Sequence, residues 1–146
     1  MIRLIEVNYI SVLAAAIAYM VLGFLWYSPS LLGKPWMKLR GLNSSELKAE
    51  QAKMGPLYGL TFVVSLLTAY ILYHVMIMSM AFFGTDRVTT GLTSGFWMWL
   101  GFVMPTQTGN AIFGSDNKNK WQLLGIDTSY QLVGLMLMGL VMGYLG

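Results

Sequence analysis

The side chain best suited to chemistry in this sequence is Asp127, the only carboxylate well inside an apolar run. A charge at the centre of a membrane helix costs about 2.5–3.5 kcal/mol, so such residues usually face water or protein and often serve a function. Polar residues gather near the same level of two consecutive apolar runs. The predicted cluster, which could line a hydrated cavity for an ion or small solute, consists of Thr106, Gln107, Asn110, Asp127 and Gln131.

Residue spacing brings this cluster to one depth. Asp127 lies six residues after Trp121, which is about 9 Å along a helix. Gln107 lies six residues before Phe113, and the short connection 114–120 makes the two helices antiparallel neighbours. Asp127 and Gln131 share a helix face at spacing i, i+4, and Gln107 and Asn110 share one at i, i+3.

A structural role for the same residues remains open. Asp127 could be wetted at the membrane interface, or could meet Lys118 or Lys120. The amide side chains could simply hydrogen-bond between helices, which contributes about 0.6–2 kcal/mol for each bond.

Pro105 predicts a kink just before the cluster. It lacks the amide hydrogen that would bond the carbonyl of Gly101, and prolines of this kind bend helices. Gly101 and Pro105 are therefore a candidate hinge.

The elements that position these residues are membrane helices. Of the 146 residues, 56% are apolar and only 10% are charged, whereas a soluble domain carries about 25% charged residues. Runs of about 20 apolar residues span a bilayer, and in lipid they must be helical. We predict a single all-α domain over residues 1–146, an integral membrane four-helix bundle in a lipid bilayer, with spans at about 9–26, 57–83, 92–113 and 121–145.

The charge distribution predicts the orientation of the chain. The first and third connections carry Lys34, Lys38, Arg40, Lys48, Lys53, Lys118 and Lys120, against Arg3 and Arg87 on the other side. The positive-inside rule then places both connections in the cytoplasm and both termini outside it. Because this rule explains the net charge of +3, we expect no nucleic-acid binding.

The first connection contains a helix start signal. Asn43 is followed three residues later by Glu46, which is the spacing of a capping box. A short amphipathic helix should follow at the cytoplasmic surface, ending at Gly55, with Pro56 opening the second span.

Glycines at small-xxx-small spacing predict close helix packing. They form the pairs Gly91 with Gly95 and Gly139 with Gly143, and such pairs let helix backbones approach within one subunit or between subunits. Four short helices enclose little space, so we expect a homo-oligomer.

Other side chains favour structural interpretations. Trp26, Tyr27, Trp36 and Trp121 are expected to anchor helix ends at the interface, and His74 is expected to make a hydrogen bond between helices. With no cysteine and one histidine, we expect no metal and no cofactor. Packing against lipid is the expected role of the methionines, including Met76, Met78, Met80, Met136, Met138 and Met142.

Two stretches resemble a family of small membrane proteins, DUF1761 (domain of unknown function 1761). The first is Gly23-Phe24-Leu25-Trp26-Tyr27-Ser28-Pro29, then Leu32-Gly33-Lys34-Pro35-Trp36. The second is Trp99-Leu100-Gly101-Phe102-Val103, then Asn110, Phe113, Trp121, Gly139, Gly143 and Gly146. The resemblance covers nearly the whole chain and implies a four-span protein of a prokaryotic plasma membrane. It implies no activity and no catalytic residue.

The sequence therefore predicts an uncharacterised multi-pass membrane protein with no assignable activity. It is not expected to be an enzyme, since no nucleophile elbow, zinc-protease motif, phosphate-binding glycine loop or carboxylate pair is present. A transporter or channel is one alternative, resting on the Asp127 cluster and Pro105. A membrane accessory or scaffold protein is the other, resting on the glycine spacing and the capped connection.

Overall fold

The computed structural model describes residues 5–146 and is all-α, so Arg3 lies outside the described residues. The described chain forms seven α-helices and one π-helical segment. In chain order these are α1 (Tyr9–Trp26), α2 (Gly33–Arg40), α3 (Ser44–Lys53), α4 (Gly55–Phe83), α5 (Arg87–Met98), η1 (Trp99–Val103), α6 (Met104–Gly114) and α7 (Lys120–Leu145).

Three helices are long and apolar enough to cross a membrane: α1, α4 and α7. Their bounds agree with the first, second and fourth predicted spans to within two residues. A continuous third span over residues 92–113 is not confirmed, because the helix there is divided into α5, η1 and α6. The amide of Met104 bonds the carbonyl of Trp99, five residues earlier. Pro105 cannot donate to the helical ladder, which gives a physical reason for the altered turn just before it.

Local sequence signals set the helix ends. Asn8 caps α1 by accepting from the Ser11 amide at 3.3 Å, and Asp86 caps α5 by accepting from the Thr89 amide at 3.0 Å. Gly84 ends α4 with a positive φ of 65°, a conformation that glycine adopts without steric cost. The turn from α4 into α5 is therefore short.

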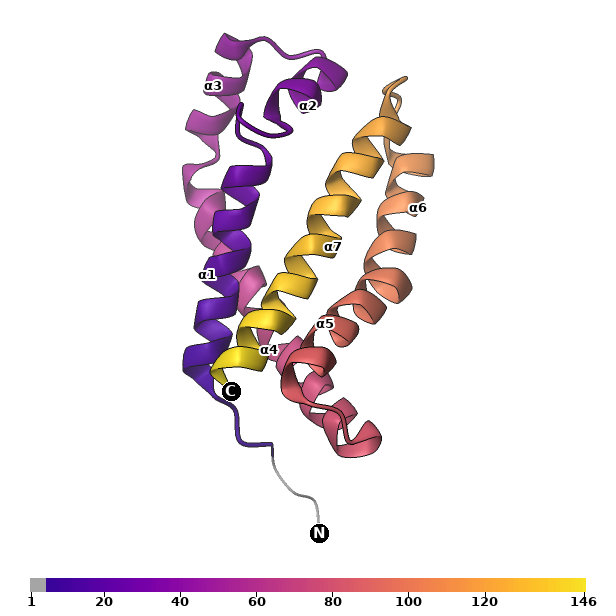
Figure 1. Cartoon of the computed structure of the whole chain (residues 1–146). Helices are drawn as coiled ribbons and strands as arrows, with labels where there is room; N and C mark the ends of the chain where they lie inside the picture. Colours follow the sequence, from indigo (N-terminus) through magenta and orange to yellow (C-terminus); the bar gives the residue numbers. More distant parts are fainter. Residues whose placement is uncertain (1–4) are drawn as a thin grey trace.

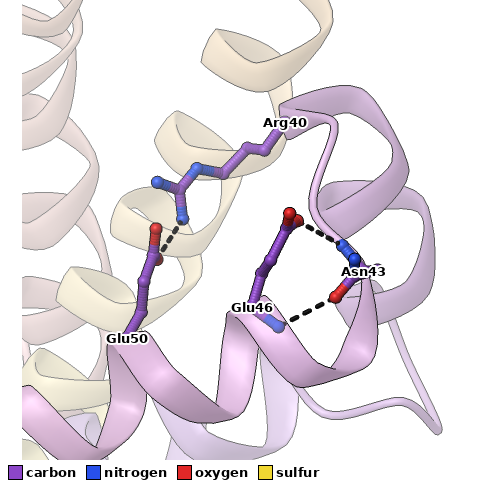
Figure 2. A network of polar contacts seen from close by, with 4 residues as sticks. All are labelled: Arg40, Asn43, Glu46 and Glu50. Atoms are coloured by element: carbon purple, nitrogen blue, oxygen red, sulfur yellow. Dashed lines mark hydrogen bonds and ion pairs between the residues drawn. The ribbon is translucent and has the colours of Figure 1, made fainter.

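The predicted capping box at Asn43 is confirmed. The Glu46 amide donates to the Asn43 side chain at 2.8 Å, and the Asn43 amide donates to the Glu46 carboxylate at 2.9 Å (Figure 2). The prediction of an amphipathic helix is wrong, since every residue of α3 except the partly buried Leu47 is exposed. Its composition leaves no apolar face, because Ala49 and Ala52 are the only other apolar residues.

Helix α7 occupies the centre of the bundle and packs against α1, α5 and α6 (Figure 1). The start of α1 and the end of α7 lie at the same end, where the Asn8 side chain donates to the Gly146 carbonyl at 2.9 Å. At the other end lie α2, α3 and the turn between α6 and α7 (Figure 1). We call these the terminal end and the loop end of the bundle.

The buried core lies toward the terminal end. It comprises Val12, Ala15, Ala16, Ala69, Leu72, Tyr73, Met76, Leu135, Met138 and Met142. The expectation that the methionines face lipid is wrong for Met76, Met138 and Met142, which are fully buried. Unbranched methionine side chains fill the irregular spaces left beside the glycines of α5 and α7.

The four glycines expected to mediate helix packing lie between α5 and α7. A Cβ atom added to Gly91 would lie 2.0 Å from the Gly139 carbonyl oxygen, and one added to Gly95 would lie 2.6 Å from that of Leu135. One added to Gly143 would lie 2.9 Å from the Arg87 carbonyl oxygen. Backbone therefore meets backbone here, and no side chain fits between the two helices.

Candidate functional site

Asp127 lies in the loop half of α7 and is hydrogen-bonded across the bundle. The Tyr27 hydroxyl donates to its Oδ1 at 2.6 Å. Tyr27 is the residue at which α1 ends, so the start of the first connection supplies the donor. The carboxylate is partly buried.

A tight turn after α1 holds Tyr27 in place. The Leu32 amide donates to the Trp26 carbonyl at 3.0 Å, and the Gly33 amide donates to the Ser28 carbonyl at 2.9 Å. A Cβ at Gly33 would lie 2.3 Å from the Tyr27 carbonyl oxygen, so glycine is required for this turn. The turn starts α2 in a direction that brings Trp36 beside Tyr27, with ring centroids 5.2 Å apart and an angle of 61° between the ring planes.

Two indoles fix the segment of α7 around Asp127. Trp26 donates to the Ile126 carbonyl at 3.2 Å, and Trp99 donates to the Thr128 carbonyl at 2.8 Å. The first comes from α1 and the second from η1. The backbone on each side of the carboxylate is thus tied to a different neighbouring helix.

Three of the predicted cluster residues share one cavity. Gln107 and Asn110 from α6 and Asp127 from α7 line a space of about 210 Å³, together with Ser115 and Lys120. Gln107, Asn110 and Asp127 therefore lie at one level of the bundle, as their spacing along the chain predicts.

The other two cluster residues do not line this cavity. Thr106 is exposed, and its hydroxyl donates to the Phe102 carbonyl of its own helix at 2.6 Å. Gln131 faces α1, where its side-chain oxygen accepts from the Tyr19 hydroxyl. Of the hinge candidates, Gly101 lies within η1 and Pro105 lies in the first turn of α6.

No lysine neutralises Asp127 in the described part of the chain. The single ion pair found there joins Arg40 to Glu50 at 3.2 Å. Lys120 lines the cavity, and its ammonium group lies 5.6 Å from the centre of the Trp121 ring. The carboxylate therefore lines the cavity with Tyr27 as its direct partner.

A second, larger cavity is lined by Tyr27. It has a volume of about 510 Å³ and lies between α1, α2, α3, α4 and α7. Its walls include Phe24, Tyr27, Trp36, Arg40, Glu50 and Tyr130. Tyr27 thus lines the larger cavity and is bonded to the carboxylate that lines the smaller one.

The arrangement can bind a proton or a small cation. An ionised carboxylate with one hydroxyl donor keeps spare acceptor positions, and the two amide side chains add oxygen acceptors. No group of three histidine, cysteine, aspartate or glutamate residues suited to a metal ion occurs within residues 5–146.

Comparison with known proteins identifies the family. Residues 10–143 match the family described as "Protein of unknown function (DUF1761)". The chain belongs to this family. No curated protein and no solved structure matches it.

In this DUF1761 chain, sequence reasoning missed the aromatic half of the site. Trp26, Tyr27 and Trp36 were expected only to anchor helix ends, yet Tyr27 bonds Asp127 and Trp26 bonds the adjacent backbone. The turn around Gly33 belongs to the same sequence stretch that resembles the family. That stretch was the available signal, because a buried carboxylate requires a donor.

Helix α2 was also missed. Pro35 in its first turn and Gly41 at its end, with a φ of 73°, are the standard start and stop signals. Without α2, the position of Trp36 could not be derived.

Proposed function

We propose that this DUF1761 protein crosses the membrane four times and that Asp127 binds a proton or a small monovalent cation on a transport pathway. Helices α1, α4 and α7 supply three spans. The fourth is the helical run 87–114, whose outer surface supports contact with lipid. Three large apolar side chains on this surface are exposed: Trp97 to 61%, Phe102 to 67% and Phe113 to 90%.

The contact between the first and third connections supports placing the loop end of the bundle in the cytoplasm. The side chains of Asn117 and Asn119 donate to the Leu39 carbonyl at 3.3 and 3.1 Å, so the turn after α6 contacts the end of α2. Seven basic residues then gather at this end. The positive-inside rule favours its placement in the cytoplasm of a prokaryotic cell, with the terminal end outside.

The observation on which the transport proposal rests is the cavity shared by Gln107, Asn110 and Asp127. A volume of about 210 Å³ accommodates several waters, each of which occupies about 30 Å³ in the liquid. A carboxylate within a membrane helix that lines a cavity large enough for water is a typical candidate for a proton or cation site.

Flux measurements on reconstituted vesicles test this proposal. An internal pH-sensitive dye reports proton flux, and ion-sensitive dyes report Na⁺ and K⁺. Asp127→Asn, which cannot ionise, should lower the affected flux by at least about tenfold. Asp116→Asn is the matched control, because Asp116 is exposed in the nearby turn and loses the same charge. If every flux is the same in wild type and Asp127→Asn, the transport proposal is wrong.

We also propose that the protein is not an enzyme and acts as a homo-oligomer. Among residues 5–146, the single histidine, His74, hydrogen-bonds with the Tyr70 carbonyl of its own helix at 2.8 Å, so the prediction of a bond to a neighbouring helix is wrong. An apolar cavity of about 480 Å³ between α4 and η1, lined by Leu67, Ile71 and Phe102, offers a surface for a second copy.

A membrane accessory role is the second candidate. The observation in its favour is the exposure of α3, whose polar surface is free to contact a partner. Replacing residues 43–53 with an unrelated capped helix should then release a specific co-purifying protein. Recovery of the homo-oligomer alone from wild-type cells would count against this role.

A further inference from the structure

The larger cavity lies where membrane-spanning helices give way to polar ones. Its lower wall comes from the last turns of α1 and the first turns of α4, including Phe24, Tyr58 and Thr61. Its upper wall comes from α2 and α3, including Arg40 and Glu50. Figure 1 shows α2 and α3 beyond the end of α1. In a four-span protein this level is that of the lipid headgroups.

The cavity presents one positive and one negative group. Arg40 and Glu50 are partly exposed, and their ion pair spans 3.2 Å at the upper wall (Figure 2). Exposed pairs of this kind are weak, so a ligand that offers a better partner to each group can open them. Lys34, Lys38, Lys48 and Lys53 lie at the same end but do not line the cavity. The charge of the lining is therefore balanced.

Aromatic rings form a second recognition element. Tyr27 and Trp36 meet edge to face with a 61° angle between their planes, and Phe24 contacts Tyr58 with ring centroids 5.7 Å apart. The face of Trp36 already holds a cation, because the Arg40 guanidinium lies 4.6 Å from its centre. Cations of this kind are attracted by aromatic faces.

We propose that this cavity binds a zwitterionic phospholipid, with the phosphate on Arg40 and the ammonium group between Glu50 and the face of Trp36. Guanidinium binds phosphate through two parallel hydrogen bonds. When Arg40 turns to the phosphate, it frees both Glu50 and the Trp36 face for the ammonium group. The acyl chains leave along the apolar lower wall between α1 and α4. The balanced charge of the lining disfavours an anionic lipid.

This inference rests on the proposed membrane embedding but not on transport by Asp127. The Asp127→Asn variant keeps an oxygen that can accept from Tyr27, so it should retain lipid binding even if flux is lost. If the wild type transports normally but binds zwitterionic and anionic lipids equally well, the lipid site is wrong and the transport proposal is unaffected.

Native mass spectrometry of the delipidated full-length protein tests the proposal. The probes are short-chain phosphatidylethanolamine, short-chain phosphatidylglycerol and soluble glycerophosphoethanolamine. Wild type should bind phosphatidylethanolamine at least about tenfold more tightly than phosphatidylglycerol, as expected from one additional charge-assisted contact. The soluble headgroup should bind much more weakly, because it lacks the acyl chains.

Variants of the two charged residues locate the site. Arg40→Gln combined with Glu50→Gln should abolish the preference for phosphatidylethanolamine over phosphatidylglycerol. The control is Lys48→Gln, an exposed position on α3, the helix that carries Glu50, and this variant should keep the preference. Thr61→Phe, which fills the lower wall, should weaken the binding of phosphatidylethanolamine. A wild-type preference for phosphatidylglycerol, or an unchanged preference in the double variant, would overturn the proposal. If glycerophosphoethanolamine binds as tightly as phosphatidylethanolamine, the acyl chains contribute nothing and the ligand is not a lipid.

Discussion

The two halves of α7 contact their neighbours in opposite ways. From Gly134 to Gly143 the helix is largely buried, and Gly139 and Gly143 meet the backbone of α5 directly. From Lys120 to Gln131 it accepts hydrogen bonds from tyrosine and tryptophan side chains that reach across from α1, from the residue after α1 and from η1. Beside the first half lies the apolar cavity that Leu135 shares with α4 and η1, and beside the second half lie the two cavities that have charged residues in their walls.

This difference shows how one helix can serve both as a rigid support and as the wall of a site. Close backbone contact gains dispersion energy over many atoms. Long aromatic side chains hold two helices apart and still fix their separation through hydrogen bonds. Substitutions that disturb one half should therefore leave the other half largely intact.

The largest effect is expected at the glycine contact. Gly139→Ala places a methyl group 2.0 Å from the Gly91 carbonyl oxygen, so the helices must separate, at a cost of about 3 kcal/mol. Thermal unfolding in detergent, followed by circular dichroism, measures this loss. The control is Gly125→Ala on the same helix, where nothing lies within 4 Å and alanine should be neutral or stabilising by about 0.5–1 kcal/mol. Equal stability of both variants would contradict direct backbone contact between α5 and α7.

A smaller effect is expected at the aromatic half. Tyr27→Phe keeps the ring but removes the 2.6 Å hydrogen bond to Asp127, which should lower the free energy of unfolding by about 1.5 kcal/mol. The same unfolding experiment measures it. Tyr144→Phe serves as the control, since Tyr144 is 75% exposed and makes no hydrogen bond among the described residues. An unchanged midpoint for Tyr27→Phe would mean that Asp127 does not depend on this donor.

The smallest effect concerns the cap of α5 in the glycine-packed half. Hydrogen bonds from Thr89 lower the pKa of Asp86. The ionised Asp86 carboxylate therefore stabilises the folded protein fully at pH values above the pKa of a free carboxyl. This stabilisation is lost as the pH falls through the lower pKa that Asp86 has in the folded state. Asp86→Asn keeps a capping oxygen but cannot titrate. The difference in stability between wild type and variant should shrink as the pH falls from above the pKa of a free carboxyl, about 3.9, to below the folded-state pKa, and a constant difference would contradict the role of the charge.

Local signals in the sequence predicted the helices well. The apolar run 9–26 has the same bounds as α1, and the spacing of Asn43 and Glu46 predicted the capping box. These features depend on residues within a few positions of one another. The shared depth of Gln107 and Asp127 was also predictable, because a short turn joins their helices.

Contacts between distant parts of the chain were not predictable. Tyr27 and Asp127 are 100 positions apart, and no rule of spacing connects them. Their contact depends on the turn at Gly33, on α2 and on the packing of α1 against α7. The third predicted span is not confirmed as one continuous α-helix for a different reason, since Pro105 indicated a kink but not the change in hydrogen-bond pattern over Trp99–Val103.

That π-helical turn also sets the rotational phase of α6. In an uninterrupted α-helix, each residue advances about 100°, so Gln107 would point about 120° away from Gly95, and Asn110 about 100° away from Gly91. A π turn takes in one additional residue. It therefore reduces by about 100° both the angle between Gly95 and Gln107 and the angle between Gly91 and Asn110. The glycines and the amides then face α7 together. A single residue in this turn thus determines whether one helical run can present both its packing surface and its polar surface to the same neighbour.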